Sequence, residues 1–342
     1  MAPEMRISPE LAVMDEIITT NISGLEPNAP VTVSAFIPYY GNLYLGYGHF
    51  YADARGNLDP GKFRSHGGAY VGVKAMGLFT SMQPLFSRNA GARFIVKGPA
   101  DQILSYFVSA FRGHCTLDEL HGYMGMLVRG KRGGFGEIDN MMKDLSGAGG
   151  LTHERLAHGV VRRSYMCPRT VERREIEVQH NGHLVTGTLF MPTTGNGPYP
   201  GAIDLFGGIG GCVEIRAALY ARHGYASLAL AYMNYKNLPA KFAHKWKMTY
   251  FDAAIDWLLS QPNVIPDGVA MSGVSMGSNI TLLTSVRNPR VKASVCINSD
   301  FLMQTDPRVD GNPYTSMRLK DLISFPKRAS QNIHKKLMTD HL

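Results

Sequence analysis

The sequence has few cysteines and no pattern of residues that would hold a metal ion. Its four cysteines, Cys115, Cys167, Cys212 and Cys296, lie far apart, and no two of them have the spacing of a metal-binding pair. A disulfide framework is not expected in a chain of 342 residues, so free thiols in a reducing compartment are the favoured interpretation. We therefore expect no metal centre and no disulfide scaffold.

Long apolar runs are also missing. The longest apolar stretches, such as Ala226–Met233, are much shorter than the roughly 20 residues that a membrane-spanning helix needs. Residues 1–10 include Glu4 and lack the basic start and apolar core of a secretory signal, and residues 340–342 are not a peroxisomal Ser-Lys-Leu ending. These absences predict a cytoplasmic protein with no membrane span.

Acidic residues are fewer than basic ones, 27 against 35, which gives a net charge of +8. A positive balance attracts anionic ligands, and a nucleic acid or a polyphosphate would both fit. The basic residues are spread along the chain except for the pairs Arg162-Arg163 and Arg173-Arg174, which are more typical of solvated linkers and strand edges than of a binding patch. The sequence therefore predicts neither a nucleic-acid partner nor a partner protein.

Residues 1–121 have the pattern of an all-β domain. Val31–Ile37 alternates apolar and polar residues over much of its length, and Tyr44–Tyr51 is rich in aromatic side chains. Short strands separated by Gly, Asn and Pro turns favour a sandwich of the immunoglobulin type over βαβ units. His49 and His66 are not accompanied by the other residues that a catalytic site needs, and we interpret them as structural or surface histidines.

Residues 122–150 interrupt this pattern with a high content of glycine. The stretch Gly130–Gly136 is basic as well as glycine-rich, and such a loop can hold phosphate with its backbone amides. A phosphate loop would need a strand before it and a helix after it, and neither is evident. A flexible insertion or linker is the favoured interpretation.

From residue 151 to 342 the pattern changes to β structure and then to alternating strands and helices. Asn181-Gly182, between two apolar stretches, is a strong hairpin signal. We expect strands at 174–179, 184–191, 202–206, 226–232, 269–272 and 293–297, and helices at 214–223, 250–260 and 278–286. This alternation predicts a doubly wound, mainly parallel sheet.

The segment Gly273-Val274-Ser275-Met276-Gly277 fits the G-x-S-x-G pattern of a nucleophile elbow. A strand is predicted before it and a helix after it, which is the context that the pattern requires. In such an elbow a tight turn lifts the serine oxygen clear of the sheet, and Gly273 and Gly277 let the strand and helix pack closely. A glycine-rich turn with a capping serine is the alternative. The context favours Ser275 as a nucleophile.

A second glycine-rich segment, Phe206–Gly211, follows the strand at 202–206. In a hydrolase with a nucleophile elbow, one oxyanion donor is the amide after the nucleophile, here Met276, and the other comes from the loop after an earlier strand. Gly208, with a margin of two residues, is the candidate for the second donor. A plain glycine turn or a nucleotide-binding loop is the alternative, but no acidic residue stands where a nucleotide site would need one.

These residues, in this order, resemble the family that contains the type I acyl-CoA thioesterases and the bile acid-CoA:amino acid N-acyltransferase. The similarity covers about residues 8–112 and 151–300. Besides the elbow, it is carried by Met76-Gly77-Leu78-Phe79 through Pro84, Leu189-Phe190-Met191-Pro192, Pro200 to Gly207, Ala229 to Tyr235, and Tyr250-Phe251 with Ala254 and Trp257-Leu258. The resemblance implies a β-sandwich followed by an α/β-hydrolase domain.

The resemblance also implies a substrate, the thioester of coenzyme A with a fatty or related acid. No separate cofactor is expected, because coenzyme A enters as part of that substrate. The amino-acid-conjugating branch uses cysteine as its nucleophile, so Ser275 favours hydrolysis of fatty acyl-CoA to free fatty acid and coenzyme A. The alternatives are a catalytically weak or inactive homologue, an acyl-CoA:amino acid N-acyltransferase, and another carboxylic ester hydrolase.

By this resemblance, the family's catalytic acid and histidine lie further downstream of Ser275 than this chain extends. The hydrolase domain is therefore expected to be incomplete and to lack its general base and acid. Asp300 follows the strand after the elbow but is interpreted as a turn residue, and His334 and His341 lie in a basic polar tail. Because loss of the base typically lowers turnover by a factor of ~10⁶, we expect near-background activity on palmitoyl-CoA.

Overall fold

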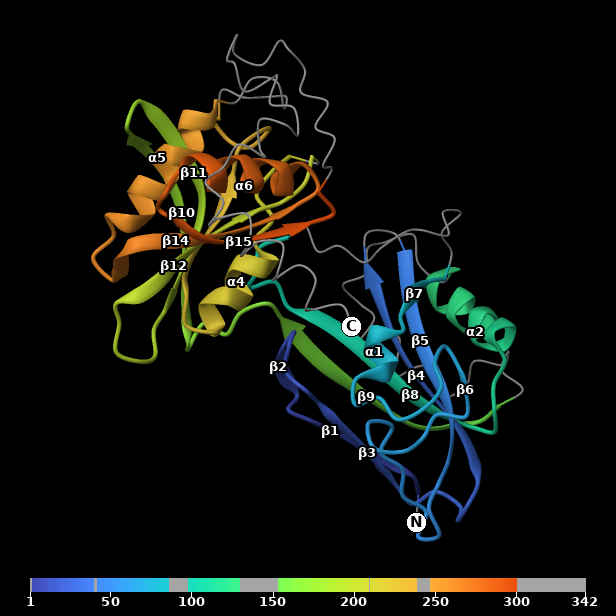
Figure 1. The fold of residues 1–342 in the computed structure, drawn as a ribbon. Coiled ribbons are helices and arrows are strands. Elements are labelled where there is room, and N and C mark those ends of the chain that lie inside the picture. The colour runs from blue at the N-terminus through green and yellow to red at the C-terminus, as the bar shows by residue number, and fades with distance from the viewer. Residues whose placement is uncertain are drawn as a thin grey trace, which may run out of the picture. The chain divides into compact units, whose positions relative to one another are not determined.

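A computed structural model describes residues 2–39, 42–85, 98–129, 153–208, 210–238 and 247–299. The chain divides into two compact units, Met1–Cys167 and Pro168–Leu342, each built around its own large sheet (Figure 1). Among the described helices, none is long and apolar enough to cross a membrane.

The first unit is predominantly β. Its seven-stranded sheet has the order β2 (Leu11–Val13), β9 (Arg155–Ser164), β8 (Leu104–Arg112), β4 (Pro30–Tyr39), β5 (Asn42–Tyr51) and β6 (Gly67–Gly68), and β7 (Gln83–Pro84) also pairs with β5. Neighbouring strands are antiparallel except β2 and β9. β1 (Glu4–Ser8) and β3 (Thr19–Ser23) form a separate two-stranded sheet, and a short helix, α1 (Gly77–Thr80), follows β6.

Apolar clusters cover both faces of the seven-stranded sheet. Successive side chains of a strand point to opposite faces, so one strand contributes to both clusters. Val33 of β4 lies in one apolar cluster, against which Met5 of β1 packs. Phe36 of the same strand lies in a second cluster with Tyr123 and Met124 of helix α2 (Leu117–Arg129). The unit expected to be all-β therefore carries a helix that supplies part of its core.

The division between the units differs from the expected start of the second domain at residue 151. Strand β9 pairs with β8 along most of its length, so residues 155–164 belong to the first unit. The segment expected to be an insertion from residue 122 also begins inside α2, while residues 130–150 lie outside the described residues. Strand β9 is defined by its pairing with a distant strand, which leaves little trace in the local pattern. Helix α2 begins with a local signal, the capping pair Thr116 and Glu119, and continues into the glycine-rich segment.

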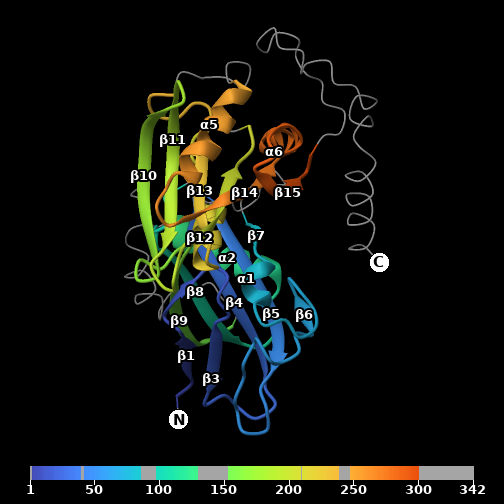
Figure 2. The same ribbon diagram turned by 60° about the vertical axis from the view of Figure 1, so that its left-hand side comes forward.

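The second unit is built on a six-stranded mixed sheet. Its order is β10 (Val171–His180), β11 (His183–Pro192), β13 (Ala226–Ala231), β12 (Tyr199–Leu205), β14 (Val264–Val274) and β15 (Val291–Ile297), with β10 and β15 at opposite ends (Figure 2). β12, β13, β14 and β15 are parallel, as expected, and the predicted hairpin at Asn181-Gly182 adds the antiparallel strands β10 and β11.

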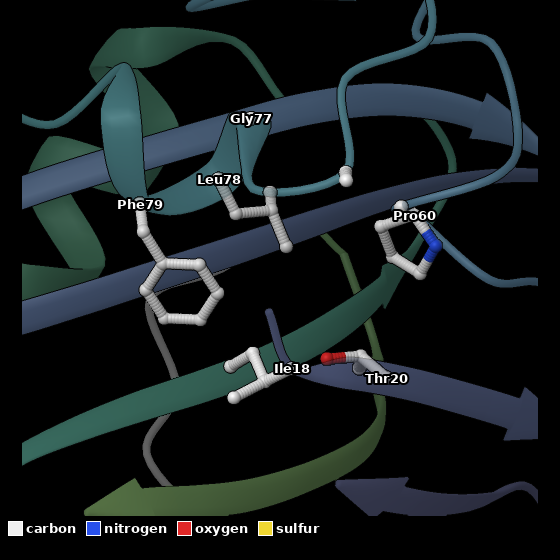
Figure 3. Close-up of a pocket in the computed structure, with 8 residues that line it drawn as sticks. Ile18, Thr20, Pro60, Gly77, Leu78 and Phe79 are labelled. Atoms are coloured by element: carbon white, nitrogen blue, oxygen red, sulfur yellow. The ribbon is translucent and has the colours of Figure 1, made fainter. Parts of the chain in front are cut away.

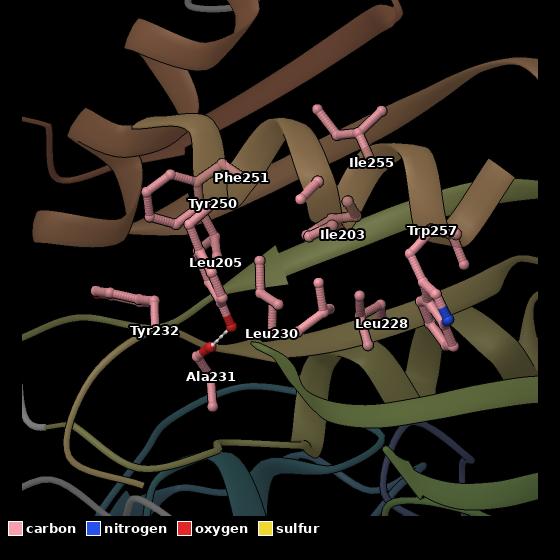
Figure 4. Close-up of a cluster of buried hydrophobic side chains, with 14 of the residues drawn as sticks. Ile203, Leu205, Leu228, Leu230, Ala231, Tyr232, Tyr250, Phe251, Ile255 and Trp257 are labelled. Carbon is pink, nitrogen blue, oxygen red and sulfur yellow. Dashed lines mark hydrogen bonds between the residues drawn. The ribbon is translucent and has the colours of Figure 1, made fainter. Parts of the chain in front are cut away.

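Helices lie on both faces of this sheet. Leu228 and Leu230 of β13 point into the main apolar cluster, where Phe251 of α5 (Met248–Leu259) packs with them (Figure 4). Ser227, on the opposite face of the strand, donates a hydrogen bond to Ala217 O of α4 (Ile215–Arg222). α6 (Met276–Arg287) packs beside α5. A sheet with helices on both faces is the α/β architecture expected from the sequence.

Candidate active site

Ser275 lies in the turn between β14 and α6, where the sequence pattern places it. Its φ is +52° and its ψ is −122°, a conformation that residues with a side chain rarely adopt. Its amide donates to Ile297 O at 2.9 Å, and its carbonyl accepts a hydrogen bond from the amide of Ser278 at 2.9 Å. These bonds hold the turn, and the residue is exposed at its apex.

The glycines on either side of Ser275 permit contacts that no other residue would. A Cβ on Gly273 would lie 2.2 Å from Gly277 O, and a Cβ on Gly277 would lie 2.4 Å from Phe206 O. Both distances are far inside van der Waals contact, and the clashing atoms belong to the backbone, which cannot move aside cheaply. The strand, the turn and the helix therefore pack as closely as a nucleophile elbow requires.

The amide of Met276 is the first of helix α6 and makes no hydrogen bond within the described residues. The first amides of any helix have no partner inside the helix, and the helix dipole makes this end favourable for negative charge. The amide of Met276 is therefore available, next to Ser275, to donate to a group of negative charge.

The loop that begins with Gly207 and Gly208 lies against the elbow. It follows β12, and β12 pairs with β14 in a parallel register that sets Leu205 opposite Gly273. A Cβ on Gly207 would lie 3.3 Å from Ser275 Cβ, and a Cβ on Gly208 would lie 3.3 Å from Met276 Cε. The two glycine-rich segments that the sequence singled out thus meet at one edge of the sheet.

A buried ion pair supports the start of this loop. Asp204 is 2% exposed and lies 2.9 Å from Arg216 Nη2, and it also accepts a hydrogen bond from Ser272. The same Arg216 nitrogen donates to Leu205 O at 3.0 Å. Burial raises the pKa of Asp204, and the charge of Arg216 opposes that shift. Because both carboxylate oxygens are engaged, the pair anchors the backbone before the loop and has no free oxygen for proton transfer.

Sequence reasoning missed Gly207 and Arg216. Gly207 lies within the two-residue margin given for the second oxyanion donor, but the residue named as that donor was Gly208. The signal for Arg216 was Asp204, which is a charge inside the apolar strand 202–206. A buried carboxylate needs a partner, so a basic residue on the next helix was to be expected.

A general base for Ser275 is not found within the described residues. No hydrogen bond joins the Ser275 hydroxyl to a described side chain. Asp300, His334 and His341 lie outside the described residues.

The described residues contain no group of three or more His, Cys, Asp or Glu side chains that could hold a metal ion. The first unit has a small pocket lined largely by apolar residues such as Ile18, Pro60, Leu78 and Phe79 (Figure 3). Thr20 supplies the one side-chain hydroxyl of its lining, and no acid or base that could activate this hydroxyl lines the pocket. The elbow of the second unit is therefore the candidate site for chemistry.

Two family models match the chain. One is described as "Acyl-CoA thioester hydrolase/BAAT N-terminal region" and matches residues 15–128, and the other, "BAAT / Acyl-CoA thioester hydrolase C terminal", matches residues 246–339. The chain belongs to this family. The resemblance recognised in the sequence ended at about residue 300. The second family model matches as far as residue 339, so the similarity to the family includes most of the segment 301–342.

Curated relatives from Mus musculus include both branches of the family. The chain is 30% identical to bile acid-CoA:amino acid N-acyltransferase, over 88% of this chain and 62% of that protein. It is 32% identical to acyl-coenzyme A amino acid N-acyltransferase 1, over 93% and 65%, and 32% identical to acyl-coenzyme A thioesterase 1, over 83% and 57%. The chain thus spans less than two thirds of the length of each relative, and identity does not separate the two branches.

Among solved structures, a putative dienelactone hydrolase from Klebsiella pneumoniae aligns with a TM-score of 0.34 at 17% identity. The alignment covers 41% of this chain and 64% of that chain. This likeness is too slight to carry an argument. The α/β architecture follows instead from the sheet order, the parallel strands and the elbow of the chain itself.

Proposed function

We propose that the chain carries the nucleophile of an acyl-CoA thioesterase and that Ser275 is that nucleophile. The observation that carries the proposal is the backbone of Ser275, held at positive φ beside the amides of Met276 and the Gly207–Gly208 loop. Family membership supports the substrate class, a fatty acyl thioester of coenzyme A.

In the proposed reaction, Ser275 Oγ attacks the thioester carbonyl carbon and its proton passes to a base outside the described residues. Negative charge moves to the carbonyl oxygen, which the amides of Met276 and of Gly208 or Gly207 stabilise, each donor being worth about 3 kcal/mol. The C–S bond then breaks, and coenzyme A leaves as a thiol. Water cleaves the acyl-serine to release the fatty acid and regenerate the hydroxyl.

Transfer of the acyl group to an amino acid is the second candidate function. It is favoured by the relatives, since N-acyltransferases and thioesterases are equally similar to this chain. In that reaction an amine, rather than water, would attack the acyl-serine. The serine at position 275 supports hydrolysis, because the resemblance implies cysteine as the nucleophile of the conjugating branch.

For the first unit, we propose the sandwich of the immunoglobulin type that the sequence predicted. Its support is the arrangement of two sheets, since residues of β1 and β3 share an apolar cluster with Val31, Val33 and Val108 of the larger sheet. Helix α2 would then be an addition on the outer face of that sandwich.

A fluorophosphonate probe tests the nucleophile. We expect labelling of the 342-residue chain at Ser275, located by peptide mass spectrometry, and loss of labelling in Ser275→Ala. The matched control is Ser285→Ala, which removes a serine hydroxyl from α6 that, among the described residues, bonds to the helix carbonyl of Leu282 alone. Labelling that survives Ser275→Ala would contradict the proposal, whereas weak labelling of the unaltered chain would indicate that the base of Ser275 is missing. Incubation with palmitoyl-CoA and glycine then separates the two reactions, because only transfer yields an amide.

A further inference from the structure

Tyr232 reaches the glycine loop from the neighbouring strand. It follows directly after β13, which lies beside β12 in the sheet, and it is 4% exposed (Figure 4). Its hydroxyl donates to Phe206 O at 2.6 Å, and Gly207 O lies 3.2 Å from the same oxygen. One side chain thus binds two consecutive carbonyls at the point where β12 turns into the loop.

These two contacts fix the direction of two amides. In a trans peptide the carbonyl and the N–H of the same plane point in opposite directions. Because the carbonyls of Phe206 and Gly207 face Tyr232, the N–H groups of Gly207 and Gly208 point away from it. Within the described residues neither of these amides makes a hydrogen bond. Both therefore remain free to bind a ligand.

The loop needs an external support because glycines supply none. Gly207 and Gly208 have no side chains, and glycine adopts both positive and negative φ readily, so a peptide plane here would rotate at little cost. On the side of the elbow, Gly207 and Gly208 lie against Ser275 and Met276. A rotated plane would point a carbonyl, rather than an amide, to where the oxyanion forms.

We propose that Tyr232 is a positioning residue, whose hydroxyl holds the Phe206–Gly207 and Gly207–Gly208 peptide planes so that their amides stay available to the oxyanion formed at Ser275. The inference rests on the proposed function, because it concerns the same site. Tyr232 touches no reacting atom and acts through the loop. Burial raises the pKa of Tyr232, so the hydroxyl keeps the proton that it donates.

Tyr250 provides a matched control in the same core. It is 6% exposed, and its hydroxyl also donates to a backbone carbonyl, that of Ala231 (Figure 4). It makes no hydrogen bond to the described residues of the glycine loop. Tyr232→Phe removes a buried hydroxyl that contacts two carbonyls, and Tyr250→Phe removes one that donates to Ala231 O and accepts from the amide of Thr186 at 3.3 Å. Both substitutions leave backbone groups without a partner and are expected to lower stability.

The test measures the labelling of Ser275 by the fluorophosphonate probe as a maximal rate and an affinity. Phosphonylation builds negative charge on an oxygen that the same amides would bind. We expect Tyr232→Phe to lower the maximal rate about 10- to 100-fold, up to the loss typical of one missing oxyanion donor, with the affinity unchanged. Tyr250→Phe should label at the rate of the unaltered chain. In parallel, ¹⁵N-glycine relaxation should show lower order parameters for the amides of Gly207 and Gly208 in Tyr232→Phe alone.

Each outcome separates the inference from the proposed function. If Tyr232→Phe labels as fast as the unaltered chain, or if Tyr250→Phe slows equally, the positioning role is overturned while Ser275 remains the nucleophile. If the unaltered chain is not labelled at Ser275, the proposed function fails. In that case the order parameters of Gly207 and Gly208 alone test whether Tyr232 holds the loop. Equal order parameters in Tyr232→Phe and the unaltered chain would overturn the positioning role as well.

Discussion

Ser275 stores strain at the point where the chemistry is proposed. A residue held in a sparsely populated backbone conformation costs about 1–3 kcal/mol and persists only when its surroundings over-determine it. Here the amide of Ser275 bonds to Ile297 and its carbonyl accepts from both the amide and the hydroxyl of Ser278. The conformation presents the side chain at the apex of the turn, so the strain serves the exposure of the hydroxyl.

This strain predicts a difference between two substitutions of the same residue. Ser275→Gly should be more stable than Ser275→Ala by about 1 kcal/mol, because relief of about 1–3 kcal/mol of strain exceeds the entropic cost of glycine, about 0.5–1 kcal/mol. Both variants lack the hydroxyl, so their comparison isolates the backbone. Denaturant unfolding of the two proteins provides the measurement. Equal stabilities would show that the turn is not strained.

Helix α2 is defined by its first turn and by one buried face. Thr116 and Glu119 form a capping box, in which the Thr116 hydroxyl accepts from the amide of Glu119 at 3.3 Å and the Glu119 carboxylate accepts from the amide of Thr116 at 2.8 Å. Leu120, Tyr123 and Met124 are each at most 2% exposed. A deletion that began at residue 122 would therefore remove two core residues of the first unit.

The burial of this face predicts the effect of two neighbouring substitutions. Met124→Ala should lower the free energy of unfolding of the first unit by about 2–5 kcal/mol, as for other buried methionines. Gly122→Ala is the matched change on the exposed face. A Cβ there meets nothing within 4 Å, so it should raise helix stability by about 0.5–1 kcal/mol. If Met124→Ala left the free energy of unfolding unchanged, the helix would not support the sheet. Circular dichroism during denaturation measures both changes.

At the scale of the whole molecule, the apolar core is divided. The large cluster of the second unit contains residues from Ile176 to Ile280, and the two clusters of the first unit contain residues from Ile22 to Ala157. Within the described residues, each of these clusters contains buried residues of one unit alone. Each unit can therefore gain cooperativity from its own core.

Divided cores predict two unfolding transitions that different signals can separate. Trp257 is buried in α5 of the second unit, and the other tryptophan of the sequence, Trp246, also falls in the range of that unit but lies outside the described residues. Tryptophan fluorescence is therefore expected to report the second unit, while circular dichroism reports both. Met124→Ala should shift a transition seen by circular dichroism and leave the fluorescence midpoint within error. Ser275→Gly should shift the fluorescence midpoint. A single coincident transition that both substitutions move would contradict the division.

Local patterns in the sequence were sufficient for much of the second unit. The hairpin at Asn181-Gly182, the apolar strands of the parallel sheet and the elbow at Ser275 all appear where they were expected. The hairpin and the elbow depend on residues close in sequence, and β12 and β13 are buried on both faces, which leaves a continuous apolar run. β15 is largely exposed although its sequence is apolar. The boundary at 151 was not predictable in this way, because β9 is defined by its pairing with β8. The start of α2 did have a local signal, the capping box of Thr116 and Glu119.

The sequence by itself determined the family, the elbow motif around Ser275 and the order of strands and helices that leads to it. Only the tertiary structure decided what surrounds that serine. Asp204 and Arg216 are 12 residues apart and Phe206 and Tyr232 are 26 residues apart. The charge of Asp204 indicated only that a basic partner exists, and no local pattern relates Phe206 to Tyr232. The parallel pairing of β12 with both β13 and β14 brings the glycine loop, the elbow and Tyr232 to the same edge of the sheet. The physical reason is that a sheet aligns the ends of its strands whatever their separation along the chain.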